Sequence, residues 1–432
     1  MDKNNQQITN KELATAFTET STTKTGEPLD APKDKSRSKK NKLKKPIDKM
    51  VLWFSIVGGL GFVGGVTMLL FALFTSSEII DSIQYPDLAG DASGEAIYSD
   101  LTGESLADAS LKTAPAYCIQ TPNGTDGARP HAGLNQAGVI FEAIAEAGIT
   151  RFAAIYQNPT ASIIGPIRSL RIYYLQWDTP FDCTIVHAGG SGDALAAVSR
   201  GYKNLDENYT YMYRGTVGSR LWNNLFTTAE NLRRFSDDNG YTTSEIKGFK
   251  RMTPEESSRS RIDTLAVEKL DIVKPASGNT SELKPAVSNI ALRLGGWGDF
   301  NVKYQYDEHS NKYFRSYESG AAHEVYDCAE GDGNGQNPES NCSLTQMAPS
   351  VVVAMIVSER RAADNYHEDI DVIGMGDAYI FQNGTAVRGT WKKDSAEAQI
   401  QFLDADGKEI ALAPGQTFIT AVPNYGSVLV LK

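Results

Sequence analysis

Alternation of apolar and polar side chains predicts a pair of strands around residue 147. Positions 139 to 146 alternate between apolar side chains and the glutamates Glu142 and Glu146, as in a half-buried strand. The dipeptide Ala147-Gly148 and a second apolar run, 152 to 156, follow, so the segment is typical of a β-hairpin. A helix is the alternative, because alanine is abundant and the glutamates are four residues apart. Either structure would place both glutamates on one face.

Strand-like patterns return in the last third of the chain. Apolar runs at 302–306 and 351–357 favour strands, whereas the region from 254 to 270 favours a helix. The later alternating segments are separated by the turn dipeptides Asn383-Gly384, Asp406-Gly407 and Pro414-Gly415. We therefore expect a β-meander or small barrel at the C-terminal end.

The stretch from 165 to 193 combines helix, strand and turn signals. Pro166 can be the first residue of a helix, since its missing N–H would be unpaired there anyway, and this helix should end before Thr179. A β-branched run at 183–186 predicts a buried strand, and a glycine-rich turn then leads into a second helix from 194 to 200. A strand, a glycine turn and a helix N-terminus together aim backbone N–H groups at an anion.

A run of 25 residues without a charged side chain, 51 to 75, predicts a single transmembrane helix. Lysines and arginines crowd into the residues just before it, and acidic residues follow it, so the N-terminus is expected inside and the rest outside the membrane. A cleaved signal peptide is the alternative, but the apolar run is long for one. The expected divisions are a disordered cytoplasmic tail (1–50), the membrane helix (51–75), an acidic linker (76–113), an N-terminal α/β domain (114–288) and a C-terminal β-rich domain (289–432).

Composition narrows the kinds of partner. With 432 residues, 41% of them hydrophobic, the chain can form two globular domains. The net charge of the whole chain is −11, and because the N-terminal tail (1–50) carries +5, the remainder carries −16, which argues against nucleic acid as a partner. The basic run beside the apolar segment fits anionic inner-leaflet lipids instead.

The four cysteines form no CxxC pair, so no metal site is expected, and no cofactor is expected either. Cys328 and Cys342 bracket a Gly/Asn-rich run, and we expect a disulfide between them in an oxidising compartment. Cys118 and Cys183 could form a second bridge, although Cys183 could also be a plain core residue.

Two sets of residues could carry chemistry. His187 and Ser191, with an acid such as Glu142, could form a nucleophile, a base and an orienting group. The structural alternative is that Ser191 caps the following helix and His187 hydrogen-bonds the backbone. The second set would bind a phosphate or carboxylate ligand, although its arginines could equally pair with Glu142 and Glu146. Its members are Arg151, Arg168, Ser169, Arg171, Gly189, Gly190 and Asp193.

Several of these stretches together resemble the YerB-like family, a group regarded as bacterial lipoproteins and defined as a domain of unknown function. The resemblance covers about residues 115 to 430, and its motifs are Arg129-Pro130-His131-Ala132-Gly133-Leu134, Gly148-Ile149-Thr150-Arg151-Phe152, Gly165-Pro166-Ile167-Arg168-Ser169-Leu170-Arg171, Val186-His187-Ala188-Gly189-Gly190-Ser191 and Gly389-Thr390-Trp391-Lys392-Lys393. It implies an extracytoplasmic, membrane-tethered protein but no established reaction. The chain departs from the family in having no cysteine near its apolar segment that could take a lipid. It also has Trp222-Asn223-Asn224 where the family is expected to carry a histidine.

The sequence thus predicts an α+β protein, with a mixed α/β domain followed by a smaller β-rich domain and preceded by one transmembrane helix. We expect a cell-membrane protein whose C-terminal portion is extracytoplasmic. Its expected function is to bind an anionic or glycan ligand of the cell wall in a cleft of the N-terminal domain. An envelope hydrolase that uses His187 and Ser191 is one alternative, and a structural partner of a membrane complex is another. Whether the protein is an enzyme, and its oligomeric state, stay open.

Overall fold

The computed structural model describes residues 96–215, 223–269, 288–295, 298–328 and 342–431. The predicted membrane segment, its basic flank and most of the acidic linker lie outside these ranges. Among the residues that the structure does describe, no helix is long and apolar enough to span a bilayer.

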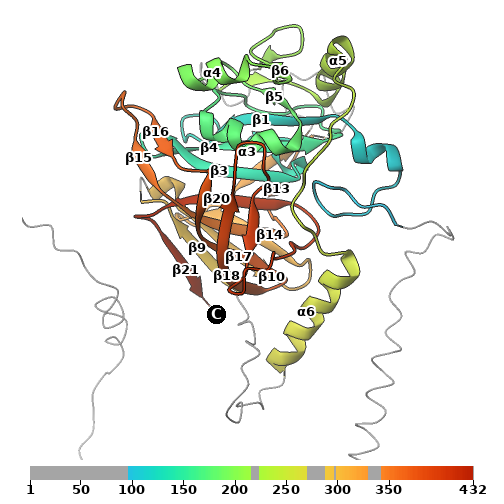
Figure 1. The fold of residues 1–432 in the computed structure, drawn as a ribbon, viewed down its shortest axis with the longest axis vertical. Coiled ribbons are helices and arrows are strands. Elements are labelled where there is room, and N and C mark those ends of the chain that lie inside the picture. The colour runs from blue at the N-terminus through green and yellow to red at the C-terminus, as the bar shows by residue number, and fades with distance from the viewer. Residues whose placement is uncertain (1–95, 216–222, 270–287, 296–297, 329–341, 432) are drawn as a thin grey trace, which may run out of the picture. The chain divides into compact units, whose positions relative to one another are not determined.

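A ten-stranded sheet runs through the molecule, with the order β19-β18-β17-β14-β20-β3-β4-β1-β5-β6 (Figure 1). Its strands, in chain order, are β1 (Ala116–Pro122), β3 (Val139–Glu146), β4 (Ile149–Gln157), β5 (Thr184–Val186), β6 (Asn204–Leu205), β14 (Val351–Val357), β17 (Gly374–Gln382), β18 (Thr385–Lys393), β19 (Gln401–Leu403) and β20 (Thr417–Pro423). Strand β20 lies between β14 and β3 and is parallel to both, so strands from both ends of the chain share one sheet.

Smaller sheets and short helices complete the fold. One four-stranded sheet has the order β11-β10-β9-β21, and one three-stranded sheet has the order β13-β12-β2. Their strands are β2 (His131–Ala132), β9 (Asn289–Arg293), β10 (Val302–Asp307), β11 (Lys312–Tyr317), β12 (Glu324–Asp327), β13 (Ser343–Gln346) and β21 (Ser427–Leu431). Two strand pairs stand apart: β7 (Tyr213–Arg214) with β8 (Leu225–Phe226), and β15 (Glu359–Arg361) with β16 (Glu368–Ile370). The α-helices are α3 (Ile172–Asp178), α4 (Gly192–Val198), α5 (Ala229–Asn239) and α6 (Pro254–Lys269), and 3-10 turns occur at Ala109–Thr113, Leu134–Gln136, Thr179–Phe181 and Gly298–Phe300.

The predicted α+β division into a mixed α/β domain and a separate β-rich domain is wrong. The described part of the chain is mainly strand, and the C-terminal strands β17, β18 and β19 form a meander that belongs to the ten-stranded sheet rather than to a β-rich domain of its own. The physical reason is β20, whose seven residues are all buried. A strand buried on both faces and both edges needs two partners, and the N-terminal hairpin supplies one of them.

The hairpin predicted at 139–156 is confirmed, as β3 and β4 joined by Ala147-Gly148. Both turn residues have positive φ, +49° and +76°, as a two-residue hairpin turn requires. However, a bulge between Ile144 and Glu146 shifts the register, so Glu142 and Glu146 do not share a face as expected.

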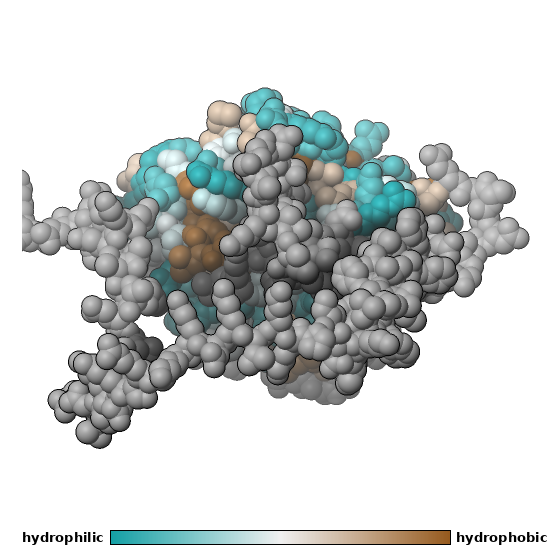
Figure 2. Space-filling view, turned by 90° about the horizontal axis from the view of Figure 1, so that it is seen from below, coloured by the Kyte–Doolittle hydropathy of each residue, from teal (hydrophilic) through white to brown (hydrophobic). Residues whose placement is uncertain are grey.

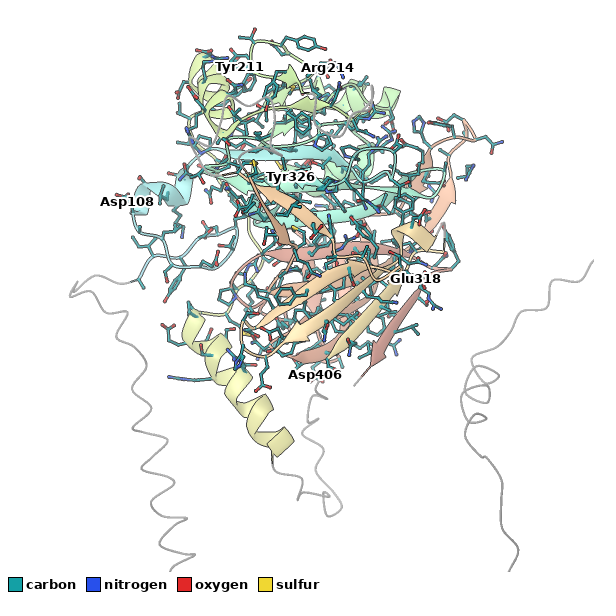
Figure 3. The ribbon with its side chains drawn as sticks, turned by 180° about the vertical axis from the view of Figure 1, so that it is seen from behind. Asp108, Tyr211, Arg214, Glu318, Tyr326 and Asp406 are labelled. Atoms are coloured by element: carbon teal, nitrogen blue, oxygen red, sulfur yellow. A yellow bond between two sulfur atoms is a disulfide. The ribbon has the colours of Figure 1, made fainter. Side chains whose placement is uncertain are left out.

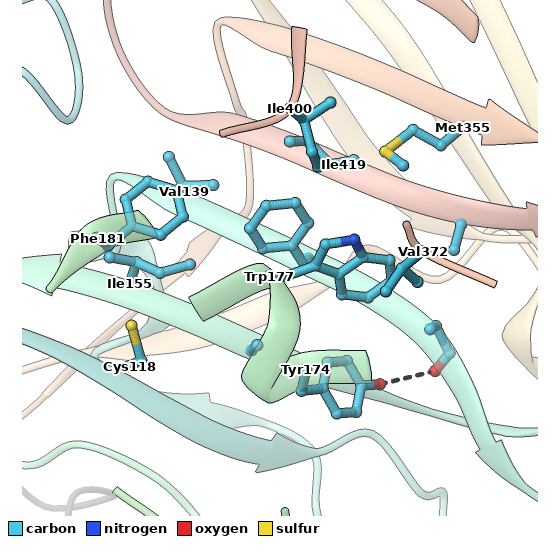
Figure 4. Packing of buried hydrophobic residues seen from close by; sticks show 14 of the residues in the cluster. Cys118, Val139, Ile155, Tyr174, Trp177, Phe181, Met355, Val372, Ile400 and Ile419 are labelled. Carbon is cyan, nitrogen blue, oxygen red and sulfur yellow. Dashed lines mark hydrogen bonds between the residues drawn. The ribbon is translucent and has the colours of Figure 1, made fainter. Parts of the chain in front are cut away.

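Helix α3 covers one face of the large sheet (Figure 4). Its Trp177 stacks on Phe141 of β3 with ring centroids 5.0 Å apart. The Tyr174 hydroxyl donates to the carbonyl of Ala143 at 3.0 Å, which ties the helix to the strand beneath it. This packing buries one of the largest side chains of the protein in the centre of the core.

The predicted helix after Pro166 begins later than expected. The backbone from 164 to 170 is extended, because its N–H groups bond to other segments: Arg168 donates to Gln120, and Leu170 donates to Gly189. Helix α3 then starts at Ile172 and ends before Thr179, as predicted. The strand at 184–186 and the helices α4 and α6 also lie where the pattern placed them.

Both pairs of cysteines form disulfides. The predicted Cys328–Cys342 bridge is present, and Cys183 is bonded to Cys118 rather than being a plain core residue. The second bridge joins β1 to the segment just before β5, two neighbouring strands of the large sheet. In Figure 3, Tyr211 and Arg214 lie near one end of the described strands and helices, Asp406 lies toward the other end, and Tyr326 lies between them.

Candidate functional site

The glycine-rich turn after β5 does not form a nucleophile–base pair. His187 is fully buried, and its ring nitrogens contact the carbonyl of Gly189 and the side-chain oxygen of Asn204, each at 2.8 Å. Ser191 is the N-cap residue of α4, but its side chain makes no capping hydrogen bond. His187 therefore has no ring nitrogen left to activate Ser191, and its backbone hydrogen bond matches the structural alternative.

The backbone of the same turn is also engaged. The N–H of Gly189 donates to the carboxylate of Asp206 at 2.8 Å, and Gly190 forms a bridge with Leu170. Asp193 lies exposed in the first turn of α4 and accepts from the N–H of Ala194. The N–H group of Gly189 thus already has an anionic partner within the protein, and a helix of only seven residues follows.

Two of the predicted anion-binding arginines are held by one glutamate. Arg151 and Arg171, each 5% exposed, both contact the carboxylate of Glu146, and the Arg171 distance is 2.6 Å. Arg151 also donates to the carbonyl of Ser169 at 3.1 Å. Burial, and then the neighbouring Arg171, lowers the pKa of Arg151. This cluster fixes the β3–β4 hairpin to the start of α3. Pairing with a glutamate was the alternative to ligand binding that the sequence left open for these arginines.

Arg168 and Ser169 are half-buried in the extended segment before α3, outside any helix. Arg168 and Arg171 therefore do not share a helix face, as the sequence pattern had led us to expect. Nor does Glu142 join this group, since it lies on the opposite face of the sheet, against a different arginine.

That arginine is Arg315 of β11, and both it and Glu142 are completely buried. A single guanidinium nitrogen of Arg315 contacts both carboxylate oxygens, at 3.0 and 2.9 Å. The remaining carboxylate sites accept hydrogen bonds from Thr150, Asn123 and Thr420. A buried ion pair of this kind is stable only when its other hydrogen-bonding positions are also satisfied, as they are here.

A chain of hydrogen bonds continues from this pair through two histidines. Arg315 can only donate, so it donates to Nδ1 of His323, whose Nε2 then donates to Nδ1 of His131 at 3.2 Å. Nε2 of His131 donates in turn to the carbonyl of Pro122 at 2.8 Å. Burial lowers the pKa of His131 to about 3, and burial with the adjacent Arg315 lowers that of His323 well below its ordinary value. Both rings are therefore neutral, as the direction of the chain requires.

We refer to Glu142, Arg315, His323 and His131, with Asn123, Thr150 and Thr420, as the buried polar network. Its members lie on β2, β3, β4, β11 and β20 and in the loops beside β1 and β12, so it joins the large sheet to both smaller ones. The sequence pattern missed Arg315 and His323. The available signal was Arg315 at an apolar position between Tyr313 and Tyr317, which alternation places on the buried face.

A pocket of about 510 Å³ lies where two hairpins meet. Its walls come from the β3–β4 turn, the β15–β16 pair and the turn after β20, which are joined where Glu146 forms a bridge with His367. In Figure 1, β15 and β16 project from the body beside β3 and β4. The lining residues are Ile144, Ala147, Gly148, Gly295, Glu359, Arg360, Arg361, Glu368 and Tyr425.

Glu359 is the unusual group in this pocket. It is 9% exposed, and its Oε1 accepts a hydrogen bond of 2.6 Å from the Tyr425 hydroxyl. Its Oε2 is buried and, among the described residues, has no hydrogen-bond partner. Burial raises the pKa of Glu359 to about 7, the Tyr425 hydrogen bond opposes this shift, and the nearby Glu368 adds to it. An unpaired carboxyl oxygen of this kind is a position for a hydrogen bond from a ligand or water.

The other charged groups of the pocket are already paired. Glu368, whose pKa burial raises, lies 3.3 Å from Arg361 across the strand pair. Arg360 pairs with the exposed Asp369 and Asp371 at 3.1 and 3.0 Å. Both described arginines that line the pocket, Arg360 and Arg361, are therefore already paired with carboxylates and are not free to bind an anion. The sequence signal for it was Ser358-Glu359-Arg360-Arg361, a charged run directly after the apolar strand β14.

Among the described residues, no group of three or more His, Cys, Asp or Glu side chains could hold a metal ion. The expectation that the protein uses no metal therefore stays a prediction, since much of the chain lies outside those ranges.

Comparison with known proteins assigns the chain to a family. It is 26% identical over 371 residues to a Bacillus subtilis (strain 168) protein named "Putative lipoprotein YerB", covering 84% of this chain and 95% of that protein. The crystal structure of the YerB protein from Bacillus subtilis matches with a TM-score of 0.59 at 22% identity, over 77% of this chain and 99% of that one. At that identity the structural likeness shows the fold alone.

Family models give the same answer over both parts of the chain. The N-terminal domain of a protein of unknown function (DUF3048) matches residues 101–242, and its C-terminal domain matches residues 292–419. Together they cover more than half of the chain, so the predicted resemblance is confirmed and the protein belongs to the DUF3048 family.

Proposed function

We propose that this chain is a membrane-anchored, extracytoplasmic protein of the cell envelope that binds a ligand in the pocket around Glu359. The lipoprotein name of its Bacillus subtilis relative supports the location. The two disulfides support it as well, because such bonds persist outside the reducing cytoplasm.

The observation that carries the binding proposal is the unpaired Oε2 of Glu359. An unsatisfied buried polar atom costs the fold on the order of 1–3 kcal/mol. Glu359 lines a pocket of ligand size, and a partner received on binding would satisfy its unpaired oxygen. The pocket combines residues from both family domains, with Gly148 from the first and Glu359 from the second.

The ligand we propose is neutral and donates hydrogen bonds, as hydroxyl and amide groups do. An anionic ligand fits less well, because Arg361 and Arg360 are paired with carboxylates and Arg151 and Arg171 share Glu146. Of the two ligand classes expected from the sequence, the glycan is the one that this pocket favours. A hydrolase built on His187 and Ser191 has no supporting contact.

The test is calorimetric titration of the full-length protein in detergent with soluble disaccharide-peptides released from peptidoglycan and, separately, with polyglycerol phosphate. We expect saturable binding of at least one probe and a loss of about tenfold in affinity for Glu359→Gln, since the amide cannot reproduce the acceptor pair of a carboxylate.

The matched control is Glu207→Gln. Glu207 also accepts a hydrogen bond from a tyrosine, Tyr209, and pairs with an arginine, Arg214, but it lies outside the pocket. This variant should bind like the wild type. The proposal would be refuted if neither probe bound, or if Glu359→Gln and Glu207→Gln lost the same amount of affinity.

A further inference from the structure

Tyr425 is the aromatic side chain that lines the pocket. It is 57% exposed, although its hydroxyl is tied to Glu359. One side of its ring lies against Gly295, where a Cβ would come within 2.5 Å of ring carbon Cδ2. Glycine at position 295 is thus required for the ring to lie where it does, and the remaining ring surface faces solvent.

Because it is held at both its hydroxyl and one side, the Tyr425 ring is a preorganised flat surface. A side chain already fixed in its binding position loses little rotamer entropy when a ligand arrives. Aromatic rings also supply a large apolar contact area next to a polar group. The polar groups beside this ring are Glu359, whose buried Oε2 has no hydrogen-bond partner among the described residues, and the Glu368–Arg361 pair.

From this arrangement we infer that the ligand is a saccharide, with one sugar ring stacked on Tyr425 and a hydroxyl donating to Glu359. The inference deepens the proposed function and rests on it. A pyranose ring has an apolar face of C–H groups and an edge of hydroxyls, and the pocket places an apolar surface and a carboxyl acceptor side by side. On the face seen in Figure 2, the described residues are mostly hydrophilic, with a few separate apolar areas.

The experiment compares two substitutions of Tyr425 in the full-length protein, titrated with the N-acetylglucosamine tetramer. Tyr425→Leu removes the ring, and we expect it to weaken binding by about tenfold or more, as loss of an aromatic stacking surface does. Tyr425→Phe keeps the ring and removes only the hydroxyl, so its affinity should stay within about threefold of the wild type.

Tyr366→Leu is the matched control. Tyr366 is 58% exposed and lies on the turn between β15 and β16, yet it does not line the pocket. This variant should bind the tetramer like the wild type, which would show that the loss in Tyr425→Leu is specific to the pocket.

A second probe separates this inference from the proposed function. Polyglycerol phosphate carries hydroxyls but no sugar ring. If it binds with dependence on Glu359 while the tetramer does not bind, the saccharide inference is overturned, and the proposed pocket at Glu359 stands but its neutral ligand does not. Tetramer binding that Tyr425→Leu leaves unchanged also overturns the inference. If neither the tetramer nor any probe of the previous section binds, both fall.

Discussion

The buried polar network and the pocket each place a glutamate beside an arginine and a tyrosine, with opposite results. Glu142 is fully buried and accepts hydrogen bonds from four side chains. Glu359 is almost as buried, but it has one donor and an oxygen with no partner among the described residues. A completed set of hydrogen bonds makes a buried carboxylate part of the fold, whereas an incomplete set leaves it available to a ligand.

The two regions also differ in where they lie. The buried polar network crosses the interior between the large sheet and the four-stranded sheet, so it ties distant parts of the chain together. The pocket lies at the ends of two hairpins, where the walls can be exposed without opening the core. Stability and binding are thus assigned to separate glutamates, and substitutions of Arg315 and Glu359 test this assignment.

The largest effect is expected from Arg315→Met, which leaves Glu142 buried without its counter-charge. Loss of one partner of a buried pair costs about 3–5 kcal/mol. Urea unfolding should show this as a lower free energy of unfolding. Arg315→Met combined with Glu142→Gln should recover part of the loss, because the amide removes the unpaired charge. A loss below about 1 kcal/mol in the single variant would show that the network does not stabilise the fold.

Glu359→Gln should instead raise the free energy of unfolding, and only at higher pH. Burial raises the pKa of Glu359 from its ordinary value of 4.5 to about 7. Between these pH values the folded protein binds more protons than the unfolded chain, so the stability linked to this carboxyl is fully present below pH 4.5. It is lost as pH rises through about 7. The loss is on the order of 3 kcal/mol.

The glutamine variant lacks this titration, so it should be more stable than the wild type at pH 8 and similar to it at pH 4.5. Thermal or urea unfolding at the two pH values measures the difference. Glu207→Gln should show no gain at pH 8, because the Tyr209 hydrogen bond lowers the pKa of Glu207. A stability difference for Glu359→Gln that does not change with pH would contradict the placement of this carboxyl.

The smallest effect is expected from Ser191→Ala. As the N-cap of α4 without a side-chain capping bond, Ser191 should contribute less than about 0.5 kcal/mol to the free energy of unfolding. Thr228 is the comparison, because its hydroxyl accepts from the N–H of Asn231 at 2.9 Å at the start of α5. Thr228→Ala should cost about 1 kcal/mol. Equal costs in the two variants would mean that Ser191 makes a bond in solution that the structure does not show.

The sequence by itself determined the strands, turns and loops that depend only on residues close together in the chain. The β3–β4 hairpin follows from the alternation of apolar and polar side chains around Ala147-Gly148. Strand β14 has the same bounds as the predicted apolar run 351–357. The turn at Asn383-Gly384 joins β17 to β18, and the Cys328–Cys342 pair closes a short loop, so both also depend on near neighbours. Family membership followed from motifs that can be read directly from the chain.

Only the tertiary structure decided which charged groups meet. The sequence offered Arg151, Arg168 and Arg171 as possible partners of Glu142, but Glu142 pairs with Arg315, 173 positions later in the chain, because β20 joins the N-terminal hairpin to the C-terminal strands. The bulge in β3 places Glu146 on the other face of the sheet. There it pairs with Arg151 and Arg171, two of the three arginines that the sequence offered for an anion. Alternation indicates that a side chain is buried, but its partner depends on strand order and register. Those are fixed by contacts between segments too far apart for any local pattern to encode.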